Sequence, residues 1–116
     1  VQSVIDSGQA FNVIYAENDD MAKGAVAALD KANISHGVGK DVIVMGFDCN
    51  KWALEELLNQ NWNYDGQCNP YQASYIEDVI KKLESGEKID EKTIIMDEKG
   101  FDATTITQDD VDQFGI

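Results

Sequence analysis

The stretch Asn12-Val-Ile-Tyr-Ala-Glu-Asn-Asp-Asp-Met-Ala-Lys-Gly24 decides the fold of this chain. An apolar strand over 13–16 enters a polar turn, and a helix is expected from about 19 to 32, with Asn18 or Asp19 as its cap. The stretch Asp41-Val-Ile-Val-Met-Gly-Phe-Asp48 repeats the pattern as an apolar strand that ends in a carboxylate. Because ligands of open α/β sheets bind at the carboxyl ends of strands, the two polar ends predict a pocket for a polar small molecule.

The rest of the chain alternates helices and strands. Helical spacing at the start predicts a helix over 1–5 that stops at Gly8, and the run Gly24-Ala-Val-Ala-Ala28 is narrow enough to lie close to a sheet. Further helices are expected over 51–59 and 109–114, and strands over 62–67 and 93–96. The continuous apolar run 42–47 is typical of a central parallel strand covered on both faces. The order predicts an α/β fold, a parallel sheet with flanking helices and right-handed crossovers.

One further helix carries a long apolar stripe. Pro70 suits its first turn, Ser85-Gly86 closes it, and the stripe follows helical spacing at Ile76, Val79, Ile80 and Leu83. Such a stripe is an association surface if nothing in the chain covers it.

Composition limits the classes of function. A chain of 116 residues, 43% hydrophobic, suits one domain with a packed core. The net charge of −13 argues against nucleic acid and against an anionic membrane surface, since both need clustered Lys and Arg. Neither a run of membrane-spanning length nor a signal peptide is apparent in the sequence. The chain starts in the middle of a helical pattern with no preceding cap, as a fragment would.

No chemistry-bearing motif points to an enzyme. Cys49 and Cys68 form no metal-ligand spacing and have no nearby cation to activate them, so we expect inert thiols, no metal and no cofactor. The segment His36-Gly-Val-Gly-Lys40 lies before a strand, which is the wrong order for a phosphate-binding loop. No catalytic residue is predicted.

Three blocks carry a family resemblance. Tyr15-Ala-Glu-Asn-Asp-Asp-Met-Ala-Lys-Gly-Ala25, Val42-Ile-Val-Met-Gly-Phe-Asp48 and Gln67-Cys-Asn-Pro-Tyr71, with the tail 105–116, resemble the C-terminal portion of type I periplasmic sugar-binding proteins of the ribose, galactose and galactofuranose group. The resemblance implies that 1–116 is one lobe of an incomplete two-lobe receptor. It also implies that the helix within 70–86 packs on the missing N-terminal lobe and that 92–116 is a C-terminal return segment.

The resemblance also implies a binding site. Asn18 matches the Asn that binds a sugar hydroxyl, and Asp48 matches the Asp that accepts bonds from two hydroxyls. Cys68 stands where the family often has Gln, so the adjacent Asn69 is the alternative third contact. Trp52 is a candidate for stacking on the sugar ring.

Each of these residues also has a plain structural alternative. Asn18 can simply cap the first long helix, Asp48 can cap the helix that begins near residue 51, and Trp52 can be a packing residue. Asp19 and Asp20 are expected to interact with the helix dipole rather than with a ligand.

The resemblance implies a function as the solute-binding component of a carbohydrate ABC transporter, in the periplasm or outside the cell, lipid-anchored if the source is Gram-positive. The expected partners are a monosaccharide, the membrane permease, and either the missing lobe or a second copy of the chain. The sugar-binding core of a lactose-repressor-type regulator is the alternative within the same fold. A phosphoacceptor receiver domain, with Mg²⁺ held by Asp19, Asp20 and Asp48, is the alternative from another class.

Overall fold

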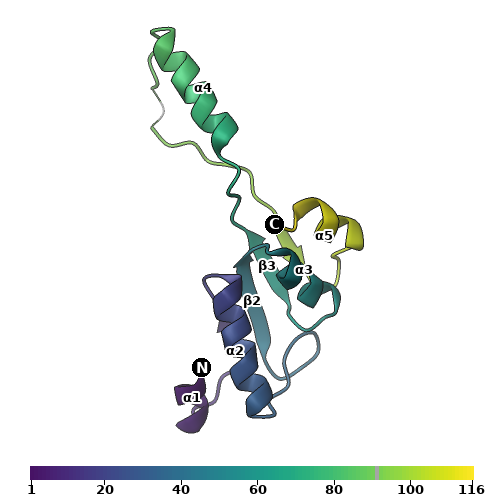
Figure 1. The fold of residues 1–116 in the computed structure, drawn as a ribbon. Coiled ribbons are helices and arrows are strands. Elements are labelled where there is room, and N and C mark those ends of the chain that lie inside the picture. The colour runs from purple at the N-terminus through teal and green to yellow at the C-terminus, as the bar shows by residue number, and fades with distance from the viewer. Residues whose placement is uncertain (91) are drawn as a thin grey trace. The chain divides into compact units, whose positions relative to one another are not determined.

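The computed structural model describes residues 1–90 and 92–116, and Figure 1 shows their fold. The chain divides into two compact units: Val1–Cys68 with Lys99–Ile116, and Asn69–Glu98. We call them the sheet unit and the α4 unit and describe each by itself. In the described residues no helix has both the length and the apolar character needed to cross a bilayer.

A four-stranded sheet organises the sheet unit. Its strands are β1 (Val13–Tyr15), β2 (Ile43–Asp48), β3 (Tyr64–Gln67) and β4 (Gly100–Asp102), in the spatial order β1-β2-β3-β4. The first three strands are parallel, as the sequence predicts, but β4 pairs antiparallel with β3. The expectation of an all-parallel sheet is therefore wrong at its last strand.

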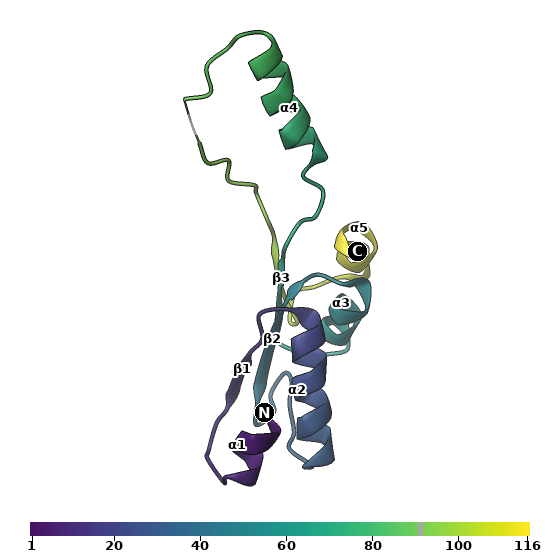
Figure 2. The same cartoon turned by 60° about the vertical axis from the view of Figure 1, so that its left-hand side comes forward.

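Helices cover one face of this sheet. They are α2 (Asp19–Lys31), α3 (Lys51–Leu58) and α5 (Gln108–Phe114), and Figure 2 shows all three on the same side of the strands. In α2 the small residues Ala22 and Ala25 are buried, whereas a Cβ added at Gly24 would meet no described atom within 4 Å. The small-residue run 24–28 therefore approaches the sheet through an alanine and not through its glycine. The largest fully buried apolar side chains of this core are Trp62, Leu29, Leu54, Leu57, Val42, Val44 and Val111.

The opposite face of the sheet is open among the described residues. Val13, Tyr15 and Ile43 are 46%, 64% and 42% exposed. The Tyr15, Phe47 and Tyr64 rings form a row with centroids 5.2 and 6.5 Å apart. The apolar run of β2 predicts cover on both faces, and in the described part of the chain only one face receives helices. The apolar side chains of β2 are therefore covered by helices on one face of the sheet only.

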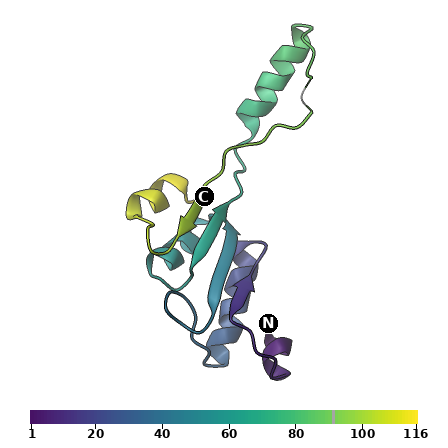
Figure 3. The ribbon, with the colours of Figure 1, turned by 180° about the vertical axis from the view of Figure 1, so that it is seen from behind.

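The two ends of the chain lie at opposite ends of the sheet unit (Figure 3). The short helix α1 (Gln2–Asp6) begins the chain, and Gly8 follows it with a φ of 72°, as its predicted stop. At the other end α5 starts with a reciprocal cap between Thr107 and Asp110. The last residue, Ile116, donates its N–H to the Cys49 carbonyl (3.1 Å) and accepts from the Lys51 N–H (3.0 Å).

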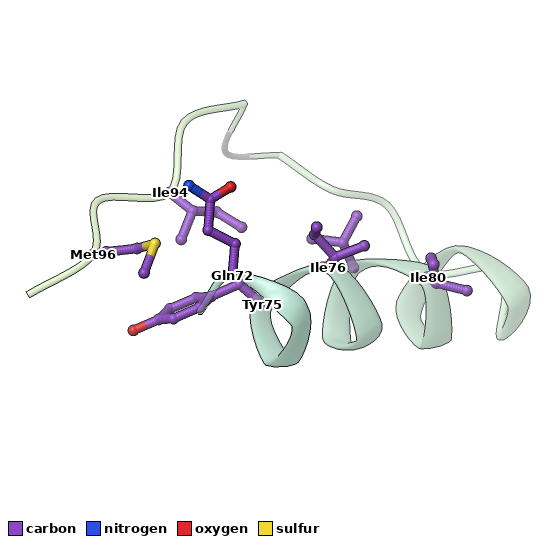
Figure 4. Close-up of a pocket in the computed structure, with 7 residues that line it drawn as sticks. Gln72, Tyr75, Ile76, Ile80, Ile94 and Met96 are labelled. Carbon is purple, nitrogen blue, oxygen red and sulfur yellow. The ribbon is translucent and has the colours of Figure 1, made fainter. Parts of the chain in front are cut away.

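The α4 unit contains one helix, α4 (Ala73–Glu84), and no residue of α4 is buried. Pro70 lies three residues before the helix, so its predicted place in the first turn is wrong. The expected strand over 93–96 is also absent from the described residues, where these positions form irregular chain. Ile94 and Met96 from that segment face the apolar side of α4 and line a shallow pocket with Tyr75, Ile76 and Ile80 (Figure 4).

Candidate functional site

Asn18 stands between β1 and α2, at the carboxyl end of the sheet. Its extended backbone (φ −155°, ψ 170°) places it as the N-cap, and its Oδ1 accepts from the Met21 N–H at 2.9 Å. Asn18 therefore caps α2, as the structural alternative to sugar binding predicts. The Nδ2 amide makes no hydrogen bond within 1–90 and 92–116, so Asn18 keeps a free donor at a half-exposed position.

The loop after β2 holds Asp48 in an uncommon backbone conformation. Asp48 and Cys49 have φ values of 122° and 61°, in the region that favours glycine. Each such residue costs on the order of 1–3 kcal/mol, and such strain collects at functional sites. The Asp48 carboxylate is half-buried and accepts no hydrogen bond from the described residues. The N-cap of α3 is Asn50, without a side-chain bond, so the alternative in which Asp48 caps this helix is wrong.

Asp19 connects the two polar ends. Its side chain is fully buried, and Oδ2 accepts from the Asn50 backbone N–H at 2.8 Å and from Asn50 Nδ2 at 3.1 Å. The sequence predicts a partner of the helix dipole, and Asp19 does lie in the first turn of α2. The structure also makes it a buried bridge between the β1–α2 turn and the β2–α3 loop. Asn18 and Asp48 each lie one or two residues from this bridge, so the structure brings these two predicted site residues to one edge.

Asp65 lies beneath the same edge, on β3. It is fully buried and is the register partner of Gly46, where an added Cβ would lie 2.6 Å from Asp19 Oδ1, so the Asp65 and Asp19 carboxyl groups are neighbours on one face of the sheet. Burial, and then the negative charge of Asp19, raise the pKa of Asp65 to about 8. Burial also raises the pKa of Asp19, against hydrogen bonds from Asn50 that lower it.

The two cysteines have different surroundings, and both are free thiols. Cys49 is buried, with its Sγ 3.9 Å from Asp65 Oδ1. Burial and the neighbouring carboxylates raise the pKa of the Cys49 thiol far above its usual range, so this thiol stays protonated and inert. Cys68 is exposed at the end of the sheet unit.

Asn69, the alternative third contact, belongs to the α4 unit. Its N–H donates to Glu98 Oε1 at 2.7 Å, and its Oδ1 accepts from the Tyr71 N–H at 2.8 Å. These bonds form a turn that leads into the segment before α4. The sugar contacts expected of Cys68 and Asn69 stay predictions.

Trp52 packs against protein side chains. Its ring meets Trp62 edge-on with centroids 5.8 Å apart, and Lys23 Nζ lies 4.4 Å above its centroid. Lys23, Trp52 and Trp62 line a groove between α2 and α3, and His36 lines it as well. The packing alternative is observed, and stacking of Trp52 on a sugar stays a prediction.

In the described part of the chain no cluster of three or more His, Cys, Asp or Glu side chains has the geometry to hold a metal ion. The Mg²⁺ site that a receiver domain needs is therefore not formed among these residues, and Asp19 Oδ2 instead accepts two hydrogen bonds from Asn50.

Two residues that lie against this edge were not predicted from the sequence. Asp65 could have been found from the sequence, because a carboxylate in the middle of a buried strand needs a partner. No sequence feature indicates the contacts of Ile116, because they are made by its backbone N–H and C=O.

The α/β fold with a four-stranded sheet and flanking helices matches periplasmic-binding-protein-like folds, although no family model matches the chain. The fructose import binding protein of Bifidobacterium longum is 33% identical over 92 residues, which are 79% of this chain and 27% of that protein. A Mycobacterium smegmatis protein solved in complex with β-D-fucofuranose is 27% identical, with a TM-score of 0.74 over 89% of this chain and 33% of that chain. A galactofuranose binding protein is 22% identical, with a TM-score of 0.82 over 97% of this chain and 38% of that chain, and this likeness concerns the fold.

These comparisons confirm the resemblance to type I periplasmic sugar-binding proteins. The chain spans about a third of the solved structures that it matches and about a quarter of the fructose import binding protein. The similarity therefore concerns a part of each of those proteins.

Proposed function

We propose that this chain supplies one side of a monosaccharide pocket in the solute-binding component of a carbohydrate ABC transporter. The observation that carries the proposal is the edge formed by Asn18 and Asp48. Asn18 follows β1 and Asp48 ends β2, and these two strands are adjacent and parallel. The Asn18 amide donor and the Asp48 carboxylate have no hydrogen-bond partner among the described residues. The two loops are joined by the hydrogen bonds between Asp19 and Asn50.

The chemistry of this edge suits a sugar. A carboxylate that accepts from two neighbouring hydroxyls makes charge-assisted bonds, which are the stronger kind, and an amide N–H donates to a hydroxyl oxygen. Neither Asn18 nor Asp48 needs a metal or a cofactor for this role. The names of the relatives, one importing fructose and one holding β-D-fucofuranose, support a monosaccharide as ligand.

The α4 unit has a separate role in this proposal. Its apolar residues Ile76, Ile80 and Leu83 are 55%, 49% and 58% exposed, an uncommon arrangement for a stable surface. In the two-lobe arrangement that the family resemblance implies, this stripe packs on a second lobe, or on a second copy of the chain where that lobe is absent. Light scattering across a concentration series tests self-association: a monomer without dye-binding apolar surface contradicts it.

The wider role follows from the pocket. Sugar between two lobes stabilises the closed arrangement by its greater affinity for that state. A membrane permease then recognises the closed form. This role places the protein outside the cytoplasmic membrane, in the periplasm or at the cell surface.

The test is a sugar titration of the ¹⁵N-labelled chain followed by amide chemical shifts, with D-fructose, D-fucose, D-galactose, L-arabinose and D-ribose. We expect one sugar to shift the amides of Asn18 and Asp48, and we expect Asp48→Asn to abolish the shifts. Asp20→Asn is the matched control, because it removes a carboxylate from the same edge that points to solvent. If no sugar shifts either amide, in this chain or in one extended to the length of its relatives, the proposal is wrong.

A further inference from the structure

The carboxylate pair beneath the site has an unbalanced set of hydrogen bonds. Asp19 and Asp65 are both fully buried. Asp19 Oδ2 has two donors from Asn50, and Asp65 Oδ1 faces the Cys49 thiol. The remaining oxygens, Asp19 Oδ1 and Asp65 Oδ2, have no donor among the described residues. A buried carboxylate oxygen without a donor is strongly unfavourable.

No positive group in residues 1–90 and 92–116 compensates for this pair. The ionisable groups that act on it are Asp48 and Cys49, from the end of β2 and the loop that follows, and neither is a cation. The other neighbours are the Asn50 amide, which is already donating, the Trp62 ring and Gly46, where a Cβ would lie 2.6 Å from Asp19 Oδ1. Two adjacent carboxylates in such surroundings cannot both be ionised, so one has to retain a proton.

We propose that Asp19 and Asp65 share one proton, and that this proton fastens the Asn18 turn and the Asp48 loop to strand β3. With the proton in place, an O–H of Asp65 donates to Asp19 Oδ1, and both oxygens left without donors are satisfied. The turn after β1 and the loop after β2 are then joined to the interior of β3 through two side chains. Asp65 is a positioning residue: it holds the residues that would meet a sugar and does not meet the sugar itself.

The proposal has a consequence for pH. The raised pKa of Asp65, to about 8, means that the folded chain holds a proton that the unfolded chain has released above the ordinary value of 3.8. This contribution to stability is therefore complete below that ordinary value and declines as pH rises through the folded pKa. On the alkaline side the two carboxylates repel each other, and the loop that carries Asp48 loosens. A sugar site at this edge would release its ligand there, and this last step rests on the proposed function.

Asp65→Asn is the decisive variant, because an Asn amide donates to Asp19 Oδ1 at every pH without a titrating proton. We expect the wild-type chain to show the infrared carbonyl band of a protonated carboxyl group at neutral pH, and the Asp65→Asn chain to lack it. Asp20→Asn, which removes an exposed carboxylate one residue from Asp19, should leave the band unchanged. Absence of the band from the wild-type chain at neutral pH overturns the proposal.

The second readout is the urea midpoint from about pH 5 to about pH 9. We expect it to decline with rising pH more steeply in the wild-type and Asp20→Asn chains than in the Asp65→Asn chain. Equal slopes in all three chains overturn the proposal. If Asp65→Asn does not fold, ¹³C titration of the wild-type Asp carboxyl carbons replaces it: one resonance should titrate on the alkaline side of neutrality, and its absence overturns the proposal.

The sugar titration separates this inference from the proposed function. If a sugar binds, its affinity should fall about tenfold between about pH 6 and about pH 9 in the wild-type chain, a typical coupling between two sites, and should fall less in Asp65→Asn. If no sugar binds but the protonated carboxyl is present, the shared proton stands and the proposed function fails. If a sugar binds with the same pH profile in both chains, the positioning role fails and the sugar site stands.

Discussion

Helices α2 and α4 have similar lengths, 13 and 12 residues, and both have an apolar side, yet they differ in burial and in capping. α2 buries four of its residues and is capped by the Asn18 side chain. α4 buries none, and its N-cap residue Gln72 makes no side-chain bond. The less apolar of the two stripes, made largely of alanine, is the buried one.

This difference teaches that an apolar stripe predicts which side of a helix will be covered but not what covers it. α2 is covered because the sheet formed by β1 and β2 lies against it. α4 has large apolar residues, Ile76, Ile80 and Leu83, and in the described part of its unit only the short segment with Ile94 and Met96 lies beside it. Helix α2 is therefore stabilised by tertiary packing. Helix α4 depends on local helix propensity, which gives only marginal stability to a helix of this length.

The largest expected effect comes from truncating one leucine in each helix. Leu29→Ala in α2 removes a fully buried side chain and should destabilise the chain by about 2–5 kcal/mol. Leu83→Ala in α4 truncates a side chain that is 58% exposed and should change stability by less than about 0.5 kcal/mol. Urea unfolding followed by far-ultraviolet circular dichroism, which reports on both helices, measures both. Equal costs would mean that α4 is packed as tightly as α2, and the comparison would fail.

Two glycines test the faces of α2. Gly46, on β2 below the helix, would place a Cβ 2.6 Å from Asp19 Oδ1 and 2.9 Å from Trp62, so Gly46→Ala should cost about 1–3 kcal/mol. Gly24 lies on the outer side of α2, where an added methyl group would meet no described atom within 4 Å, so Gly24→Ala should stabilise by about 0.5–1 kcal/mol. Opposite signs in thermal unfolding support the structure. A cost at Gly24 would mean that the outer face of α2 is covered.

The caps give a smaller effect. Asn18→Ala removes the side-chain acceptor of the Met21 N–H and should destabilise by about 1 kcal/mol. Gln72→Ala at the start of α4 removes no such bond and should leave the free energy of unfolding unchanged. Both are measured by urea unfolding monitored by circular dichroism. A substantial cost at Gln72 would show that α4 has a cap that the structure lacks.

The smallest effect concerns acid pH and α5, a third helix that is capped like α2. Hydrogen bonds from Thr107 lower the pKa of Asp110 from its ordinary value of 3.8. The contribution of this cap is thus present above that value and is lost as pH falls through the lowered pKa. Amide shifts of Thr107 and Asp110 in an acid titration measure the midpoint, with Asp109→Asn as the control for removing a charge from the same turn. A midpoint at or above 3.8 would contradict the reciprocal cap.

Local patterns predicted most of the elements of the sheet unit. The start of α2 follows from Asn18 as a cap, and the end of β2 at Asp48 follows from its apolar run. Predictions that depended on partners distant in sequence were less successful. The 93–96 segment has strand-like residues but no neighbouring strand among the described residues, and β4 forms instead from Gly100–Asp102, where two residues flank Phe101 and little in the sequence suggests a strand.

The buried contacts beneath the polar edge escaped prediction for the same reason. Asn18 and Asp48 are readable because each stands at the end of its own strand. The role of Asp19 depends on Asn50, and that of Asp65 depends on Asp19, and both partnerships exist only after the strands have paired. Sequence spacing marks the groups that can meet a ligand, whereas the groups that hold them in place become visible in three dimensions.

The backbone pairing of Ile116 with Cys49 and Lys51 has a practical consequence. The last residue completes the loop that presents Asp48, so exchange of the Ile116 amide proton with solvent reports opening of that loop from a position outside it. An environment-sensitive dye attached near the carboxyl terminus would serve as an optical sensor of that motion. The same geometry means that a purification tag fused directly after Ile116 could alter the behaviour being measured, and that a tag at the opposite end of the sheet is the safer choice.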